Sequence, residues 1–181
     1  EKPIKKLQEK LISSANNIIY LNKNFKLRTC IIMPAGTHTV VLPVGIEEIF
    51  YFFFFMNKWA PLVPGYIEHE IINENESTWS FKGDLGFMKK TVKLKVDITE
   101  WKEPTTVTFN LKGISDNFKG GGYFEAEVID ENTTKMTGNL DITAGGAMGP
   151  MVNTILKNFV PKTAEELTIA VAEKIKEEVT V

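Results

Sequence analysis

The sequence is poor in the residues on which enzymes and metal sites most often depend. Its 181 residues include one cysteine, Cys30, and two histidines, His38 and His69. A single cysteine cannot form an internal disulfide, and these three side chains lack the spacing of metal ligands. No serine stands in the context of a nucleophile elbow. The sequence therefore supports neither a metal nor a cofactor site, and each histidine is interpreted as a surface or strand-edge residue.

A strong net charge and long apolar runs are also lacking. The chain has 21 basic and 23 acidic residues, a net charge of −2, so nothing indicates a nucleic-acid partner. Its densest apolar run, residues 49–56, is far shorter than the roughly 20 residues of a transmembrane helix. The hydrophobic share of 43% is typical of a globular domain. Because no secretory signal is visible, a reducing cytoplasm is the expected compartment.

The clearest pattern is at the C-terminal end. Apolar residues recur every three or four positions over residues 148–179, which predicts a long amphipathic helix with one buried face. The stripe comprises Met148, Met151, Val152, Ile155, Leu156, Phe159, Val160, Leu167, Ala170, Val171, Ile175 and Val179. Pro161 falls inside the helix, where it removes a hydrogen bond and should kink the axis.

The region before this helix alternates in polarity, as strands do. Turn residues separate the runs, and the short connections predict an antiparallel meander. The six expected strands are residues 66–73, 77–85, 89–101, 105–113, 118–129 and 133–144. Two earlier strands, residues 25–33 and 37–42, and two short helices, residues 45–56 and 57–62, precede them. The first helix should bury one broad face made by Ile46, Ile49, Phe50, Phe53 and Phe54.

One parity of the strands is almost entirely apolar, so that face of the sheet should be buried. The inward positions include Trp79, Phe81, Gly83, Leu85, Val92, Leu94, Val96, Ile98, Val107, Phe109, Leu111, Phe124, Ala126, Val128, Met136, Gly138, Leu140 and Ile142. The opposite parity is polar and charged. Glycines at Gly83, Gly138 and residues 120–122 permit bulges and strong coiling. The expected fold is therefore α+β, a curved sheet wrapped around the long helix.

The first residues, 1–24, are expected to form an extension ahead of a single domain at residues 25–181. Their apolar positions share one helical face, and lysines crowd the other side near the start. A basic amphipathic helix can lie on an anionic membrane surface, which would place the protein at the inner face of the membrane. The alternatives are an accessory helix docked on the domain and a partly disordered tail.

The order of elements resembles the helix-grip or START-like (SRPBCC) superfamily, which includes birch-pollen allergens and polyketide cyclases. Within it the chain looks most like the CoxG family of carbon monoxide dehydrogenase proteins. The resemblance covers residues 36–175. It rests on residues 41–50, on the Pro64-Gly65 turn, on the strand pair of residues 83–94, on the triglycine strand and on Gly145-Gly146. Two features depart from the family pattern, namely the N-terminal extension and Pro161.

The resemblance implies a cavity between sheet and helix that binds an apolar ligand. The residues expected to line it are Phe53, Trp59, Pro64, Tyr66, Phe81, Phe109, Leu111, Phe124, Met148, Met151, Ile155 and Phe159. The entrance is expected near residues 59–66. The alternative is that these side chains simply fill the core.

The resemblance further implies a non-catalytic carrier or docking protein. It would hold a lipid-like or quinone-like molecule and link a molybdenum-containing dehydrogenase to the membrane. An enzyme of the polyketide cyclase type, working in the same cavity, is a second hypothesis. A structural interaction module with a filled core is a third.

Overall fold

The computed structural model describes residues 34–84 and 89–179. The extension at residues 1–24 and the strand expected at residues 25–33 lie outside the described residues. The elements, in chain order, are β1 (Ala35–Leu42), α2 (Ile46–Phe54), α3 (Met56–Trp59), a 3-10 turn (Ala60–Leu62), β2 (Tyr66–Ile71), β3 (Glu76–Asp84), β4 (Lys89–Lys102), β5 (Thr106–Gly113), β6 (Phe118–Asp130), β7 (Thr133–Ala144) and α4 (Gly149–Val179). This is the predicted order, and the helix-grip fold is confirmed.

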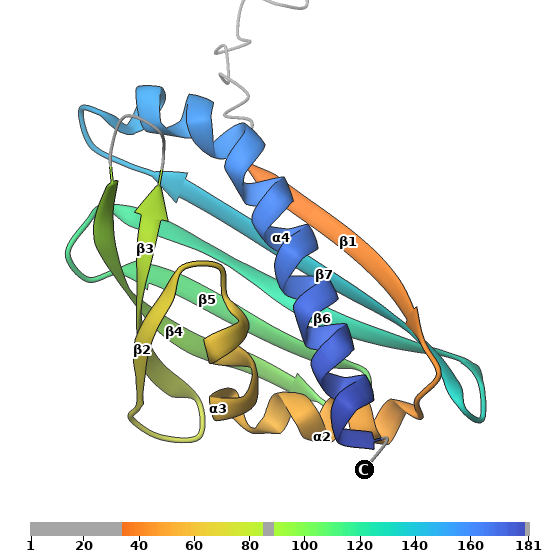
Figure 1. Ribbon diagram of the computed structural model, residues 1–181. Coiled ribbons are helices and arrows are strands. Elements are labelled where there is room, and N and C mark those ends of the chain that lie inside the picture. Colours follow the sequence, from red (N-terminus) through yellow and green to blue (C-terminus); the bar gives the residue numbers. More distant parts are fainter. Residues whose placement is uncertain (1–33, 85–88, 180–181) are drawn as a thin grey trace, which may run out of the picture. The chain divides into compact units, whose positions relative to one another are not determined.

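The seven described strands form one antiparallel sheet in the order β1-β7-β6-β5-β4-β3-β2 (Figure 1). At one edge of the sheet β1 pairs with β7, so that Ala35 is opposite Asp141 and Leu42 is opposite Thr134. The register shifts in three of the described strand pairs, β2 with β3, β4 with β5, and β6 with β7. Such irregularities bend and twist a sheet, so they favour the curvature that places a helix on one face.

Burial along the strands follows the predicted parity. Val96 and Met136 are 0% exposed and Val107 is 1% exposed. Val128 is an exception, because it is 55% exposed although its parity predicted burial. It lies where the register of β6 with β7 shifts, close to the end of β6. Periodicity therefore predicted the buried face accurately in the middle of the strands and less accurately near their ends.

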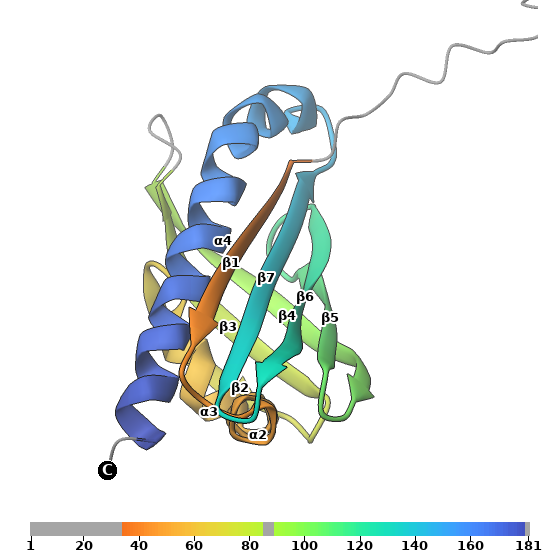
Figure 2. The same cartoon turned by 90° about the vertical axis from the view of Figure 1, so that its right-hand side faces the viewer.

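The long helix α4 packs on β1 and β7, as Figure 2 shows. Its buried side chains include Val152, Leu156, Val160, Ala164, Leu167, Val171, Ala172 and Ile175. Pro161 sits directly over Gly36 of β1, where a Cβ would overlap the Cα of the proline. The first turns of α4 run in a different direction from the rest of the helix (Figure 1), which agrees with the expected proline kink.

The two short helices cover the end of the sheet that lies beside the C-terminus of α4 (Figure 1). In α2, Ile49, Phe52 and Phe53 are buried, each at 2% exposure or less. Phe54, which was expected on this buried face, is 51% exposed. That expectation is wrong, because in the four-phenylalanine run Phe52 takes the inward position and Phe54 points to solvent.

Candidate ligand-binding hollow

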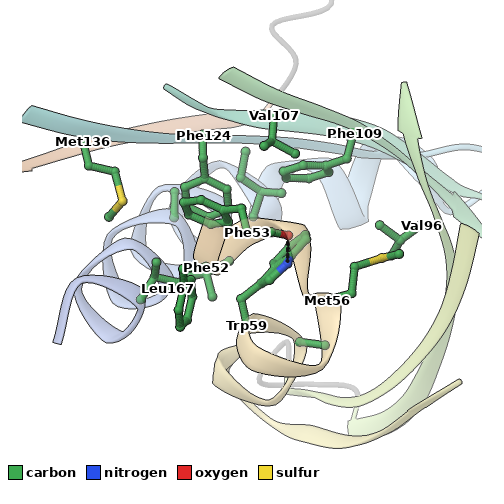
Figure 3. Packing of buried hydrophobic residues seen from close by; sticks show 14 of the residues in the cluster. Phe52, Phe53, Met56, Trp59, Val96, Val107, Phe109, Phe124, Met136 and Leu167 are labelled. Carbon is green, nitrogen blue, oxygen red and sulfur yellow. Dashed lines mark hydrogen bonds between the residues drawn. The ribbon is translucent and has the colours of Figure 1, made fainter. Parts of the chain in front are cut away.

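Aromatic rings fill the half of the interior next to α2. Trp59 and Phe53 are 1% and 2% exposed, and the Trp59 indole N–H donates to the Phe53 carbonyl at 3.1 Å (Figure 3). Phe53 stacks on Phe124 of β6 with 4.3 Å between ring centroids. Phe109 adds a further ring 5.9 Å from Trp59. These rings pack against one another, so the described residues fill this half of the interior themselves.

A hollow lies at the other half, between the sheet and the first part of α4. Strands β3 and β4 contribute Phe81, Val92 and Leu94, and α4 contributes Leu156 and Phe159. Phe118 and Ile142, from β6 and β7, are also part of the wall. The volume is about 40 Å³. Pockets for drug-sized ligands have volumes of roughly 300–1,000 Å³. A ligand of that size would therefore fit in this hollow only if the wall moved.

Among the described residues, Lys90 is the single charged residue in the wall of the hollow. Its ammonium forms an ion pair with Asp116. The hydrogen bond from Lys90 lowers the pKa of the Asp116 carboxyl, so this carboxylate stays ionised at neutral pH. Lys90 therefore offers its aliphatic stem to the hollow, while its charge is neutralised at the rim.

The start of α4 is held to the end of β7 by the side chain of Asn153. Its Nδ2 donates to the Ala144 carbonyl at 2.9 Å, and its Oδ1 accepts from the Ala144 N–H at 2.7 Å. The intervening loop contains Gly145 and Gly146, and Gly146 has a φ of 76° that suits glycine. We call this pair of hydrogen bonds the Asn153 clamp. Asn153 was not among the residues predicted for the site, although an asparagine near a helix start often forms hydrogen bonds with nearby backbone.

Comparisons with known proteins agree with this geometry. A family model matches residues 33–179, which is most of the chain. Similar solved structures include a protein from Thermus thermophilus, at 14% identity and a TM-score of 0.66, covering 80% of this chain and 99% of that one. A START superfamily protein from Mycobacterium smegmatis is 15% identical with a TM-score of 0.60, covering 79% and 97%. The chain therefore has the START-like, helix-grip fold.

A third similar structure is the Zhui aromatase/cyclase from Streptomyces sp. R1128. It is 15% identical to this START-like chain, with a TM-score of 0.62, and the match covers 81% of this chain and 96% of that one. At this identity the likeness establishes the fold alone. No curated protein sequence matches the chain. The narrower resemblance to the CoxG family stays a prediction.

The START-like domain brings only some of the predicted lining residues to the hollow. Phe81 and Phe159 are in its wall. Those that belong to the packed core are Phe53, Trp59, Phe109, Leu111 and Phe124. Ile155 and Phe159 are half-buried rather than central to the buried stripe. Phe118 was missed, although the parity that includes Phe124 also points it inward.

The expected inward placement of Met148 and Met151 is wrong. They are 58% and 46% exposed, because α4 begins at Gly149 and its buried stripe passes through Val152 and Leu156 instead. At the expected entrance, Pro64 and Tyr66 are half-buried. There the Tyr66 hydroxyl and His69 Nδ1 are 2.8 Å apart, and His69 Nε2 lies 2.7 Å from Asn57 Oδ1. His69 thus links β2 to α3.

Three further observations concern the described residues. Within residues 34–84 and 89–179, no three His, Cys, Asp or Glu side chains are grouped as a metal site would need. In the same ranges, every buried side-chain nitrogen and oxygen has a hydrogen-bond partner. None of the described helices combines the length and the apolar character that crossing a membrane requires.

Proposed function

We propose that this START-like domain is a non-catalytic carrier for an elongated apolar molecule of the lipid or quinone type. The observation that supports it best is the apolar hollow between α4 and the sheet, which has the Asn153 clamp beside it. Apolar walls bind apolar molecules by removing their surface from water. The polar groups of Lys90 and Asp116 satisfy each other, so the described wall offers no free acid or base to a reacting molecule.

The hollow is opened by movement of residues 149–160 of α4. Release of the Asn153 clamp frees these turns, and the loop of Gly145 and Gly146 lets them swing outward. Burying about 300 Å² of apolar ligand would contribute about 7 kcal/mol. Breaking the two hydrogen bonds of the clamp costs about 1–3 kcal/mol. The burial of the ligand must also offset the exposure of Val152 and Leu156 as these turns move.

The resemblance to the CoxG family supports a finer proposal. The bound molecule is quinone-like, and the protein carries it between the membrane surface and a molybdenum-containing dehydrogenase. The direct test is to add quinone-loaded protein to such an enzyme and follow quinone reduction. Unchanged reduction, compared with free quinone at equal concentration, would reject this finer role and leave apolar ligand binding intact.

The test of the carrier proposal narrows the hollow with Gly83→Val. A Cβ at Gly83 would lie 3.2 Å from the nearest Val92 methyl and 3.7 Å from the Lys90 carbonyl, so the Cβ itself needs only a small adjustment, and the two valine methyl groups take up space in the hollow. Lys82→Val is the matched control, because Lys82 is on the same strand and exposed. Binding of a short-chain menaquinone analogue is followed by tryptophan fluorescence and native mass spectrometry.

We expect wild type and Lys82→Val to bind equally and Gly83→Val to bind at least about 10-fold more weakly, with thermal unfolding of both variants used to show that they are folded. Equal binding by a folded Gly83→Val protein would refute the location of the ligand. If wild type binds no apolar probe, the protein is instead an interaction module with a filled core.

A further inference from the structure

A second surface lies at the other end of the domain, over the outward face of α2. A groove of about 700 Å³ runs there between α2, the β4–β5 turn and the last turn of α4. We call it the aromatic groove, because Phe50, Tyr51, Phe52 and Phe54 are among the residues that line it. It is separate from the hollow, since the two have no described lining residue in common.

The exposure of large apolar side chains in this groove is unusual. Tyr51, Phe54 and Val179 are 61%, 51% and 48% exposed. Single exposed apolar residues are common on proteins, but a contiguous patch in a concave surface marks a contact site. Neighbouring rings support the patch, because Phe54 lies 5.6 Å from Trp101 between ring centroids. Phe54 therefore packs against a ring of the same domain while its other side stays exposed.

Charge around the aromatic groove has one predominant sign. Among the described residues, four carboxylates line it, those of Glu47, Glu48, Glu103 and Glu178, against one ammonium, that of Lys58. The Lys58 ammonium is already paired with Glu178 at 2.7 Å. These described side chains therefore give the groove an excess of three negative charges beside its aromatic side chains. A complementary partner must supply apolar side chains and positive charge together.

The exposed aromatic rings and the excess of negative charge discriminate between three occupants, namely a lipid surface, a second copy of this chain and a helix of a partner protein. An anionic lipid surface would be repelled by the carboxylates, and two copies of this chain would bring the same carboxylates together. A basic amphipathic helix has both required properties, and helices commonly bind in apolar grooves through side chains spaced three and four residues apart. We propose that the aromatic groove binds a basic amphipathic helix of a partner protein. Its apolar residues lie against Tyr51 and Phe54, and its lysines or arginines face Glu47, Glu48 and Glu103.

The proposal does not depend on ligand binding in the hollow, and it is tested with the full chain. The probe is a fluorescein-labelled peptide of about 18 residues with leucine at helical spacing and lysine elsewhere. A second peptide with glutamate in place of lysine tests the role of charge. Vesicles of phosphatidylglycerol and phosphatidylcholine test a lipid surface, and sedimentation at increasing protein concentration tests self-association.

The key variant is Phe54→Ala, and Ile114→Ala is its control. Ile114 is 56% exposed but lies in the β5–β6 turn, away from the groove. Because both side chains are exposed, both variants should remain folded, which thermal unfolding checks. A menaquinone-analogue titration of Phe54→Ala shows whether the hollow is unaffected.

We expect the lysine peptide to bind wild type and Ile114→Ala alike, and Phe54→Ala about 10-fold or more weakly. Glu47→Gln and Glu103→Gln should each weaken binding about 3-fold, less so at high salt. Equal binding of the glutamate peptide, or equal binding by Phe54→Ala and Ile114→Ala, overturns the proposal. Vesicle binding or dimerisation that Phe54→Ala abolishes also overturns it, in favour of a lipid surface or a second copy.

Discussion

Loss of the Asn153 clamp should have opposite effects on stability and on ligand binding. In Asn153→Ala, the two hydrogen bonds to Ala144 are lost, and they are 2.9 and 2.7 Å long in the wild type. At about 1 kcal/mol each, their loss should lower the free energy of unfolding by about 2 kcal/mol. For a domain of this size, that corresponds to a melting temperature lower by about 4–8 °C.

Binding should nevertheless become tighter. If the clamp must break before a ligand enters, the wild type spends about 2 kcal/mol of binding energy on breaking these two hydrogen bonds, and the variant does not. That difference corresponds to about a 30-fold lower Kd, most of it from faster association. Isothermal titration and stopped-flow fluorescence with a short-chain menaquinone analogue measure both quantities.

Thr154→Ala is the control for this experiment. The Thr154 hydroxyl donates at 3.0 Å to the Pro150 carbonyl within the same helix, so its removal leaves the contact with β7 intact. We expect Thr154→Ala to bind as wild type does. If Asn153→Ala loses stability but binds no more tightly than Thr154→Ala, the clamp is purely structural and the proposed opening at residues 149–160 is wrong.

Three further predictions concern the packing and charges around the hollow and α4. Leu156 is 3% exposed, so Leu156→Ala should lower the free energy of unfolding by about 2–5 kcal/mol in urea denaturation while enlarging the hollow; a loss below about 1 kcal/mol would contradict its place in the core. In Gly36→Ala the new methyl overlaps Pro161, so we expect the free energy of unfolding to fall by about 1–3 kcal/mol. An unchanged free energy of unfolding would show that β1 shifts enough to relieve this overlap. The pKa of Asp116 is lowered by the hydrogen bond from Lys90, so the ionised form stabilises the folded state at neutral pH and this contribution disappears as the pH falls through the lowered pKa. Asp116→Asn should therefore melt below wild type at pH 7, with a difference that shrinks as the pH falls through the lowered pKa of Asp116. A difference independent of pH would exclude the ion pair as its cause.

The architecture could be predicted from the sequence because its signals are local. Alternation in β4 and β5 and the helical stripe through Val152 and Leu156 depend only on neighbouring residues. Predictions near the ends of elements were less accurate, as Met148 and Val128 illustrate. Periodicity gives the direction of a side chain but not where its neighbouring layer ends. In the aromatic run of α2, apolar residues on every side concealed the helical period, and Phe54 was placed on the wrong face.

The candidate site was harder to predict because it depends on contacts between distant residues. No local pattern pairs Gly36 with Pro161, or Asn153 with the backbone of Ala144. Whether Phe53 and Phe124 enclose a space or fill it depends on ring orientation, which a sequence does not specify. The inward parity therefore identified Phe81 and Leu94, but the choice between wall and core needed the structure.

The contact of Pro161 with Gly36 divides α4 into two segments that border different surfaces of the domain. Pro161 has no N–H, so the helical hydrogen bond that would stiffen α4 at this point is missing. Because Gly36 has no side chain, the proline packs closely against β1. On one side the turns from Gly149 to Val160 cover the hollow, and on the other Val179 and Glu178 border the aromatic groove. Movement of the first segment is thus mechanically insulated from the second. A molecule in the hollow should leave the affinity of the groove for its peptide unchanged, so cargo and partner would be recognised without allosteric communication.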